Sequence, residues 1–286
     1  MTVRGSKRAT VRIGTAIAGA FCAVITPTWS AHANAGIERT ACCPIVELRQ
    51  YTLHPRRLDG FVQLFEREFI EPQEAAGMRV IGQFRDLDDP DRFVWLRGFS
   101  DMPGRARALE AFYGGPVWKA RRDLANANFI DTDNVLLLHP LDARSGFALD
   151  RLQRAPQGAT PGDRGVVVVT VYPLKPAAAA AFGVYFHDTV LPELERAGFV
   201  AVAQLETETA ANTFPRLPVR SGEFVFVWVA RFPDRASSDA ARMRLADSAL
   251  WCDAIAPELE RRLGGSTQVL RLTPTARALW PGGAGP

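Results

Sequence analysis

The sequence predicts an α+β protein built from two copies of one β-α-β-β-α-β unit. First, residues 45–55 (IVELRQYTLHP) and 166–176 (VVVVTVYPLKP) share tyrosine, leucine and proline at matching places. Second, matches continue along the chain at one offset and then, after a single insertion, at a larger one. Third, each copy shows the same order of strand-like and helix-like patterns. We therefore expect a tandem duplication, with copies at residues 45–141 and 166–275.

The two copies align over most of their length. The matched pairs are Phe61 with Phe182, Phe65 with Phe186, Gly77 with Gly198, Gln83 with Gln204, Phe93 with Phe226, Trp95 with Trp228, Asp101 with Asp234 and Trp118 with Trp251. The second copy carries about twelve additional residues within 206–222. A long irregular loop on a rigid sheet is either a lid or contact surface, or an insertion that loop-closure entropy makes easy to tolerate.

The elements of the first copy follow from its residue patterns. Residues 45–53 are rich in β-branched and aromatic residues and predict a strand. Apolar side chains at helical spacing then predict an amphipathic helix that ends near Gly77. Residues 78–87 and 92–99 predict two strands around an Asp- and Pro-rich turn. A second helical region from Pro103 to Ala127, broken near Gly114 and Gly115, precedes a strand at 134–141.

This order predicts a ferredoxin-like unit, an antiparallel four-stranded sheet with both helices on one face. The bare sheet faces of two such units would cover one another, so we expect them to form a barrel within one chain. Residues 142–165 are rich in Gly, Pro and Arg and predict a linker. Residues 276–286 predict a flexible tail.

The N-terminus has the pattern of a secretory signal peptide. Residues 1–12 carry four basic side chains and no acidic one, and the apolar run 13–25 and small residues around Ala33 follow. We expect residues 1–35 to be removed and the protein to be secreted or periplasmic, or cytoplasmic if the start site is misplaced. Removal changes the net charge from +3 to about −1. Such a balance argues against a nucleic-acid partner, and no other segment predicts a membrane span.

The cysteine pattern leaves alternatives open. Cys22 lies in the predicted signal peptide, while Cys42, Cys43 and Cys252 remain. In an oxidising compartment Cys252 could form a disulfide with one of the adjacent pair. The alternative is that Cys252 is a small buried residue on a helix.

The first copy resembles a NIPSNAP domain of the dimeric α+β barrel superfamily. The similarity rests on Glu47-Leu48-Arg49 followed by Tyr51, on Gly82, on Trp95 and on Asp101 with Arg105. The second copy keeps the matching tyrosine, tryptophan and aspartate but has Val168 and Thr170 for the Glu and Arg. The resemblance implies the fold, whereas the superfamily also includes haem-degrading and other monooxygenases, so it does not fix a function.

Differences between the copies single out candidate ligand-binding residues, namely Glu47, Arg49, Tyr51, Trp95 and Arg97. They occupy alternating positions on two strands and therefore share one face of the sheet. The second copy is neutral or apolar at the three charged positions. Such a cluster is either an internal ion-pair network or a pocket for a small anionic or aromatic molecule.

Motifs for catalysis are absent from the sequence. There is no G-x-S-x-G, no phosphate-binding glycine loop and no histidine spacing typical of a metal site, so we expect no metal and no cofactor. His187 alone is a candidate haem ligand, with packing or surface exposure as the alternative. We therefore favour a small-molecule-binding or protein-interaction module, with homo-oligomerisation left open, over a haem-handling or cofactor-light monooxygenase.

Overall fold

The computed structural model describes residues 1–2, 42–160 and 162–280. The predicted signal peptide falls outside these residues except for its first two positions. None of the described helices is long and apolar enough to cross a membrane.

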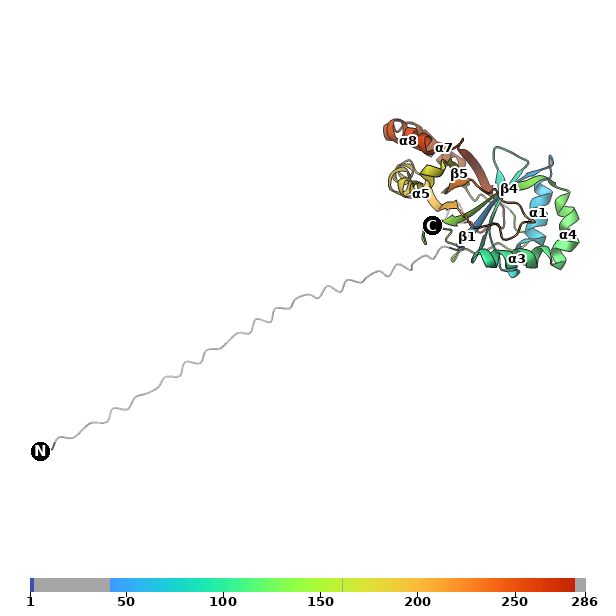
Figure 1. The fold of residues 1–286 in the computed structure, drawn as a ribbon, viewed down its shortest axis with the longest axis horizontal. Coiled ribbons are helices and arrows are strands. Elements are labelled where there is room, and N and C mark those ends of the chain that lie inside the picture. The colour runs from blue at the N-terminus through green and yellow to red at the C-terminus, as the bar shows by residue number, and fades with distance from the viewer. Residues whose placement is uncertain (3–41, 161, 281–286) are drawn as a thin grey trace. The chain divides into compact units, whose positions relative to one another are not determined.

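The first repeat, residues 45–141, contains the predicted order of elements (Figure 1). They are β1 (Ile45–Leu53), α1 (Leu58–Glu68), α2 (Ile70–Ala75), β2 (Arg79–Asp86), β3 (Arg92–Phe99), α3 (Met102–Tyr113), α4 (Pro116–Asn126) and β4 (Phe129–Pro140). Gly114 and Gly115 separate α3 from α4, as the sequence predicts.

The second repeat, residues 166–275, has the same order with two additional π-helical turns. Its elements are β5 (Val166–Leu174), α5 (Pro176–Tyr185), η1 (Phe186–Val190), α6 (Leu191–Arg196), β6 (Val200–Thr207), β7 (Phe224–Phe232), α7 (Arg235–Ala246), η2 (Trp251–Ile255), α8 (Ala256–Arg262) and β8 (Gln268–Pro274). A π-helical turn widens a helix locally and often occurs at a functional site.

Local backbone details show the duplication directly. The glycine that ends the first helical region has φ +97° in one repeat (Gly77) and +99° in the other (Gly198), a conformation that favours glycine. Asp101 and Asp234 cap α3 and α7 by accepting backbone N–H bonds from the third residue after them. β2 and β6 also shift register at equivalent places.

The eight strands form one closed antiparallel barrel. Their order around it is β1-β3-β2-β8-β5-β7-β6-β4, so each repeat supplies a four-stranded ferredoxin-like sheet. The two sheets join through their edges, β2 with β8 and β4 with β6. This arrangement confirms the predicted α+β fold of two ferredoxin-like units in an intramolecular barrel. Closure also removes the exposed sheet edges that each unit would otherwise present.

Alternate residues of every strand fill the barrel. Val46 and Leu48 of β1 pack inside it, together with apolar residues from the other strands. The chain outside the repeats completes this core, because Phe147 from the linker lies 6.3 Å from Trp280 between ring centroids. The predicted flexible tail is therefore wrong for residues 276–280, which are buried, while residues 281–286 lie outside the described part of the chain. The open end of an apolar barrel must be covered to keep water from its core, and residues 276–280 provide part of that cover.

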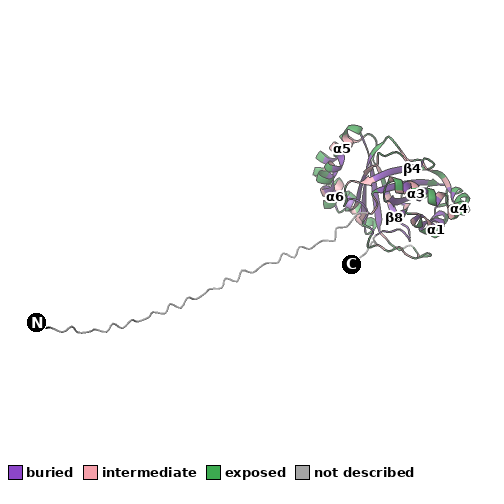
Figure 2. Cartoon of the chain, turned by 60° about the horizontal axis from the view of Figure 1, so that its bottom comes forward, coloured by how far each residue is buried: buried purple, intermediate pink, exposed green. Residues whose placement is uncertain are grey.

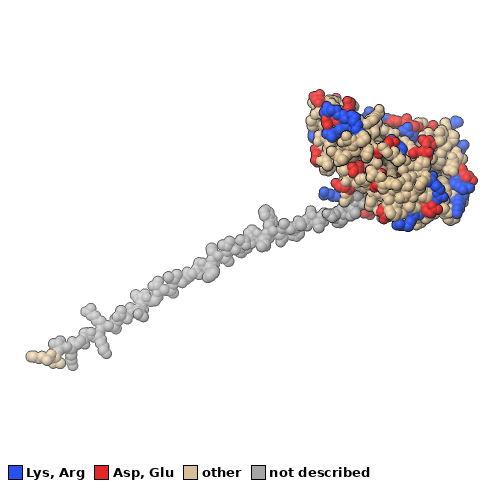
Figure 3. Space-filling model, viewed as in Figure 1, with Lys and Arg blue, Asp and Glu red and all other residues tan. Residues whose placement is uncertain are grey.

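The helices pack on the outside of the barrel and form one further core for each repeat. Figure 2 shows the strands buried beneath helices whose outer faces are exposed. On the face drawn in Figure 3, acidic and basic side chains are interspersed. Each repeat thus has a layer between its sheet and its helices, and the side chains that face outward from the strands occupy that layer.

The cysteines differ from both predicted alternatives. Cys42 and Cys43 are joined to each other, and Cys252 is a free, exposed residue on η2. Cys252 is therefore neither bridged nor buried, because η2 turns it away from the core of the second repeat.

Candidate functional site

The five candidate residues of the first repeat lie together between the sheet and its helices. β1 and β3 pair so that Glu47 lies opposite Arg97 and Arg49 lies opposite Trp95. Because side chains alternate along a strand, Glu47, Arg49 and Tyr51 all point to the helical side. None of the five is more than 6% exposed.

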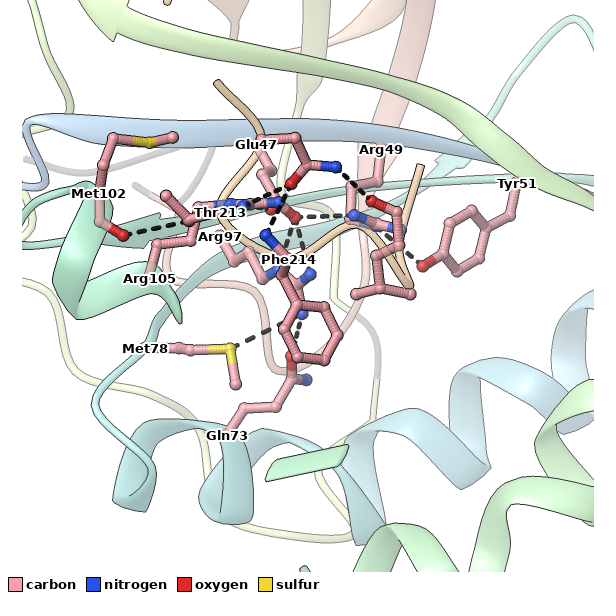
Figure 4. Close-up of polar contacts among 12 residues, drawn as sticks. Glu47, Arg49, Tyr51, Gln73, Met78, Arg97, Met102, Arg105, Thr213 and Phe214 are labelled. Carbon is pink, nitrogen blue, oxygen red and sulfur yellow. Dashed lines mark hydrogen bonds and ion pairs between the residues drawn. The ribbon is translucent and has the colours of Figure 1, made fainter. Parts of the chain in front are cut away.

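A buried ion network joins these residues (Figure 4). Glu47 Oε2 accepts hydrogen bonds from Arg49 Nη1 and Arg97 Nε, each at 2.7 Å. Arg49 Nε donates to the Tyr51 hydroxyl at 2.9 Å, and Arg97 Nη1 donates to Gln73 Oε1 at 3.2 Å. The arginines also lie over aromatic faces, with the Arg97 guanidinium carbon 4.9 Å from the Trp95 ring centroid.

Arg105, which the sequence comparison did not select as a site residue, completes the network. It lies near the start of α3, is fully buried, and donates from Nε to Glu47 Oε1 at 2.7 Å. A signal was present in the sequence, because the aligned position in the second repeat is Ser238, another loss of charge. Together Glu47, Arg49, Arg97 and Arg105 form what we call the charge cluster. It places three guanidinium groups around one carboxylate.

The electrostatics of the charge cluster keep Glu47 ionised. Burial opposes ionisation, but Arg97, Arg49 and Arg105 together outweigh it and hold the pKa of Glu47 well below its ordinary value. Burial lowers the pKa of Arg105, and Glu47 counteracts this shift. The pKa of Tyr51 is raised by burial, despite the neighbouring Arg49.

The inserted loop of the second repeat covers the charge cluster of the first. This strap, residues 208–223, runs from β6 to β7 and crosses onto the first repeat. Arg105 Nη1 donates to Asn212 Oδ1 at 2.9 Å and to Thr213 Oγ1 at 3.2 Å. Phe214 is 6% exposed and stacks on Tyr113 with ring centroids 5.9 Å apart. The loop is therefore a contact surface between the repeats.

Backbone bonds hold both ends of the strap on β4. Glu208 N–H donates to Leu137 O at 2.9 Å, and Arg220 N–H donates to Val135 O at 2.8 Å. With the strap in place, the cavity between the sheet and helices of the first repeat measures only about 30 Å³ and is lined mostly by aromatic residues and Gln73. The candidate residues thus form a closed network with little room beside it.

The second repeat has a large cavity in the equivalent layer. Its volume is about 590 Å³. The lining includes Val168, Thr170 and Tyr172 of β5, Trp228 of β7, Trp251 of η2, Leu245 of α7, Leu259 of α8, and Leu194 and Phe199 beside β6. The sequence did not predict this cavity, because it results from small side chains and not from a recognisable motif.

The aligned residues help to explain the larger space between sheet and helices in the second repeat. Glu47, Arg49, Arg97 and Arg105 are replaced by Val168, Thr170, Ala230 and Ser238. All four replacements are smaller and none is charged. Two of them, Val168 and Thr170, line the cavity, so the exchange of Glu47 and Arg49 for smaller residues contributes to its volume.

A few polar groups face this apolar cavity. Trp228 Nε1 is buried and has no hydrogen-bond partner among the described residues. Burial raises the pKa of the Tyr172 hydroxyl well above its ordinary value, with Tyr185 acting in the same direction. The Tyr172 hydroxyl therefore stays protonated at neutral pH.

Charged groups surround the mouth of the cavity. Asp88, from the β2–β3 turn of the first repeat, forms a salt bridge with Arg271 of β8, and both line the cavity. The turn comprises only residues 87–91, so it does not cover the second repeat as the strap covers the first. Val269, another lining residue, is 53% exposed, and the apolar wall therefore continues to the surface.

The histidines do not form a metal or haem site within residues 42–160 and 162–280. His187 lies on η1, is exposed, and is not among the residues that line the cavity, so it does not fit a haem ligand inside the fold. His139 lies 3.7 Å from a carboxylate oxygen of Glu206 near the β4–β6 pairing. No group of three or more His, Cys, Asp or Glu side chains suited to a metal occurs in the described part of the chain.

Comparison with known proteins supports the predicted resemblance. Residues 46–143 match the NIPSNAP family. The first repeat is a NIPSNAP domain. The match ends where the linker begins, so it does not extend to the second repeat. No curated protein sequence matches the chain.

Some solved structures resemble one repeat of the chain, and others resemble most of its length. An uncharacterized NIPSNAP-like domain protein from Burkholderia xenovorans is 32% identical, with 34% of this chain and 85% of that chain covered and a TM-score of 0.32. A monooxygenase-like protein from Lactobacillus acidophilus is 14% identical, with 82% and 98% covered and a TM-score of 0.48. An anthrone oxidase-like protein is 16% identical, with 82% and 93% covered and a TM-score of 0.48.

Proposed function

We propose that the protein binds a small, largely apolar aromatic molecule in the cavity of the second repeat. The observation that carries this proposal is a cavity of about 590 Å³ lined mainly by aliphatic and aromatic side chains. Ligand pockets in proteins span about 300–1,000 Å³ and combine apolar walls with few polar groups. The space beside the charge cluster of the first repeat, about 30 Å³, is too small for such a ligand.

The polar groups of the cavity narrow the ligand further. The unpartnered Trp228 Nε1 donor would be satisfied by a ligand acceptor, since a buried donor without a partner costs about 1–3 kcal/mol. The ligand that fits is an aromatic ring bearing a hydroxyl or carbonyl oxygen. Charged groups at the mouth remain in water, so they do not require a charged ligand.

Two matched variants test this proposal with 4-iodophenol as the probe. Val168→Phe fills part of the cavity, and Val184→Phe makes the same change at an exposed position of α5. We expect titration calorimetry to show binding to the wild type and to Val184→Phe, and at least tenfold weaker binding to Val168→Phe. Equal affinities for all three proteins, or no binding to any, would show that the cavity is not the site.

The oxygenase alternative would act on a ligand in the same cavity. No histidine of the described residues lines it, so a haem-dependent route has no histidine axial ligand there. Oxygen uptake measured with the bound phenol tests a reaction without haem. Ligand-dependent uptake that Val168→Phe abolishes would make the protein an oxygenase, and binding without uptake would support the binding function alone.

A further inference from the structure

We infer that the first repeat holds a small halide-sized anion beside its charge cluster, beneath the strap. The charge cluster contains three arginines and one glutamate, all between 0% and 1% exposed. If all four are ionised, the buried net charge is +2. Buried charge is costly unless an opposite charge compensates it, and Glu47 compensates only one arginine.

The charge cluster also lacks hydrogen-bond acceptors. Glu47 already accepts bonds from Arg49, Arg97 and Arg105. Arg105 Nη2 and Trp95 Nε1 are nevertheless buried and find no acceptor among the described residues. Arg97 Nη2 lies 2.7 Å from Glu47 Oε2 but is poorly oriented for a hydrogen bond. Every unsatisfied group of this set is a donor, and an anion is a pure acceptor.

The neighbouring cavity limits the size of the anion. It measures about 30 Å³, and Tyr51, Gln73 and Trp95, all of which contact cluster arginines, line it. A space of about 10–15 Å³ on this measure holds one water molecule. A halide fits such a space, whereas an aromatic carboxylate does not. Aromatic faces beneath Arg49 and Arg97 offset part of their charge but offer no acceptor atom.

The strap encloses this site. The side chains of Asn212 and Thr213 accept hydrogen bonds from Arg105 Nη1. Phe214 packs over Tyr113. The cluster arginines are at most 1% exposed, so a bound anion compensates charge that bulk water cannot screen. Such an anion binds the folded chain only and therefore stabilises it by mass action.

Thermal unfolding in chloride and gluconate tests the inference. Gluconate is too large for the cavity, so sodium gluconate can replace sodium chloride at constant ionic strength. We expect the Tm of the wild-type chain to rise with chloride, by about 3 °C for each tenfold increase above half-saturation. A Tm that depends on ionic strength alone would overturn the inference.

Three variants assign the effect to the cluster. Arg105→Gln lowers the buried charge and should remove most of the chloride dependence, whereas Glu47→Gln raises the charge and should strengthen the dependence. Arg216→Gln, at a strap arginine that is 65% exposed, is the matched control and should retain it. If Arg105→Gln keeps the wild-type dependence, the chloride acts elsewhere.

Bromide soaked into crystals of the wild-type chain gives a readout that needs no variant. We expect an anomalous peak within contact distance of Trp95 Nε1 or the cluster guanidinium groups. A water molecule at that place, with bromide confined to the surface, would identify an adventitious ion only and contradict the inference.

Discussion

The two repeats share a backbone plan but use the layer between sheet and helices in opposite ways. The first fills that layer with the charge cluster and is covered by the strap of the second. The second leaves a cavity of about 590 Å³, next to the short turn of the first. Four substitutions remove the charges from the second repeat, and the inserted loop covers only the first. The same backbone plan therefore holds a closed ion network in one repeat and a large cavity in the other.

The largest effect should come from Glu47→Gln, because it removes the one carboxylate among three buried arginines. We expect a loss of about 3–5 kcal/mol in the free energy of unfolding, measured with urea at pH 7. Glu110→Gln is the matched control, since Glu110 is 67% exposed and, among the described residues, forms a salt bridge only with Arg216. Its loss should stay below about 1 kcal/mol. Equal losses would mean that burial of the cluster has no energetic consequence.

The same variant makes a prediction about pH. Glu47 has a lowered pKa in the folded chain, so its contribution is fully present above the unfolded value of about 4.3 and decreases as the pH falls below it. The stability difference between wild type and Glu47→Gln should therefore be constant from pH 7 to about 5 and shrink below about pH 4. A difference that persists unchanged to pH 2 would contradict the assignment.

Replacing all four residues of the charge cluster by the aligned residues of the second repeat should reduce the free energy of unfolding less than Glu47→Gln alone. The exchange is Glu47→Val, Arg49→Thr, Arg97→Ala and Arg105→Ser. It creates a cavity, which costs stability, but leaves no uncompensated charge. We expect a smaller loss than for Glu47→Gln and a second, weaker binding event for 4-iodophenol in calorimetry. A loss equal to the sum of the four single changes would show that the cluster does not act as a unit.

The strap should contribute about 2 kcal/mol through Phe214. Phe214→Ala removes its stacking on Tyr113, although a loop can partly collapse into the space. Hydrogen exchange should accelerate at the Arg220 amide, which donates to Val135 O, while the β5–β7 ladder stays protected. Unchanged exchange would mean that the strap is held by its ends alone.

The smallest effect concerns the Tyr172 hydroxyl. Its raised pKa favours the folded chain below about pH 10, the ordinary value for tyrosine, and this contribution is lost as the pH rises further. The stability difference between wild type and Tyr172→Phe should therefore be constant up to about pH 9 and fall above pH 10. No change up to pH 11 would show that the hydroxyl is solvated in the cavity.

Sequence reasoning predicted the repeat, the order of strands and helices along the chain, and the barrel, because each depends on local periodicity and on matched positions. It brought Glu47, Arg49, Tyr51, Trp95 and Arg97 together because two paired strands fix their faces. It did not predict the destination of the strap, which follows from pairing of β4 with β6 across the repeats. The burial of Trp280 was also not predicted. It packs at an end of the barrel, and that end forms only when the two repeats pair.

Arg105 and the cavity show a different limit. Arg105 joins the cluster from a helix, so strand periodicity could not place it, and only comparison with Ser238 pointed to it. The cavity is defined by what the second repeat lacks. A small residue aligned with a larger counterpart, such as Val168 with Glu47, indicates space between sheet and helices only when the two repeats are compared position by position.

Crystals of the chain soaked with 4-iodophenol test the central difference between the repeats most directly. The iodine gives an anomalous signal that locates the probe without assumptions about its pose. We predict one iodine peak, in the cavity beside Trp228 and Trp251. A peak beside the charge cluster of the first repeat, or none in either layer, would contradict the account.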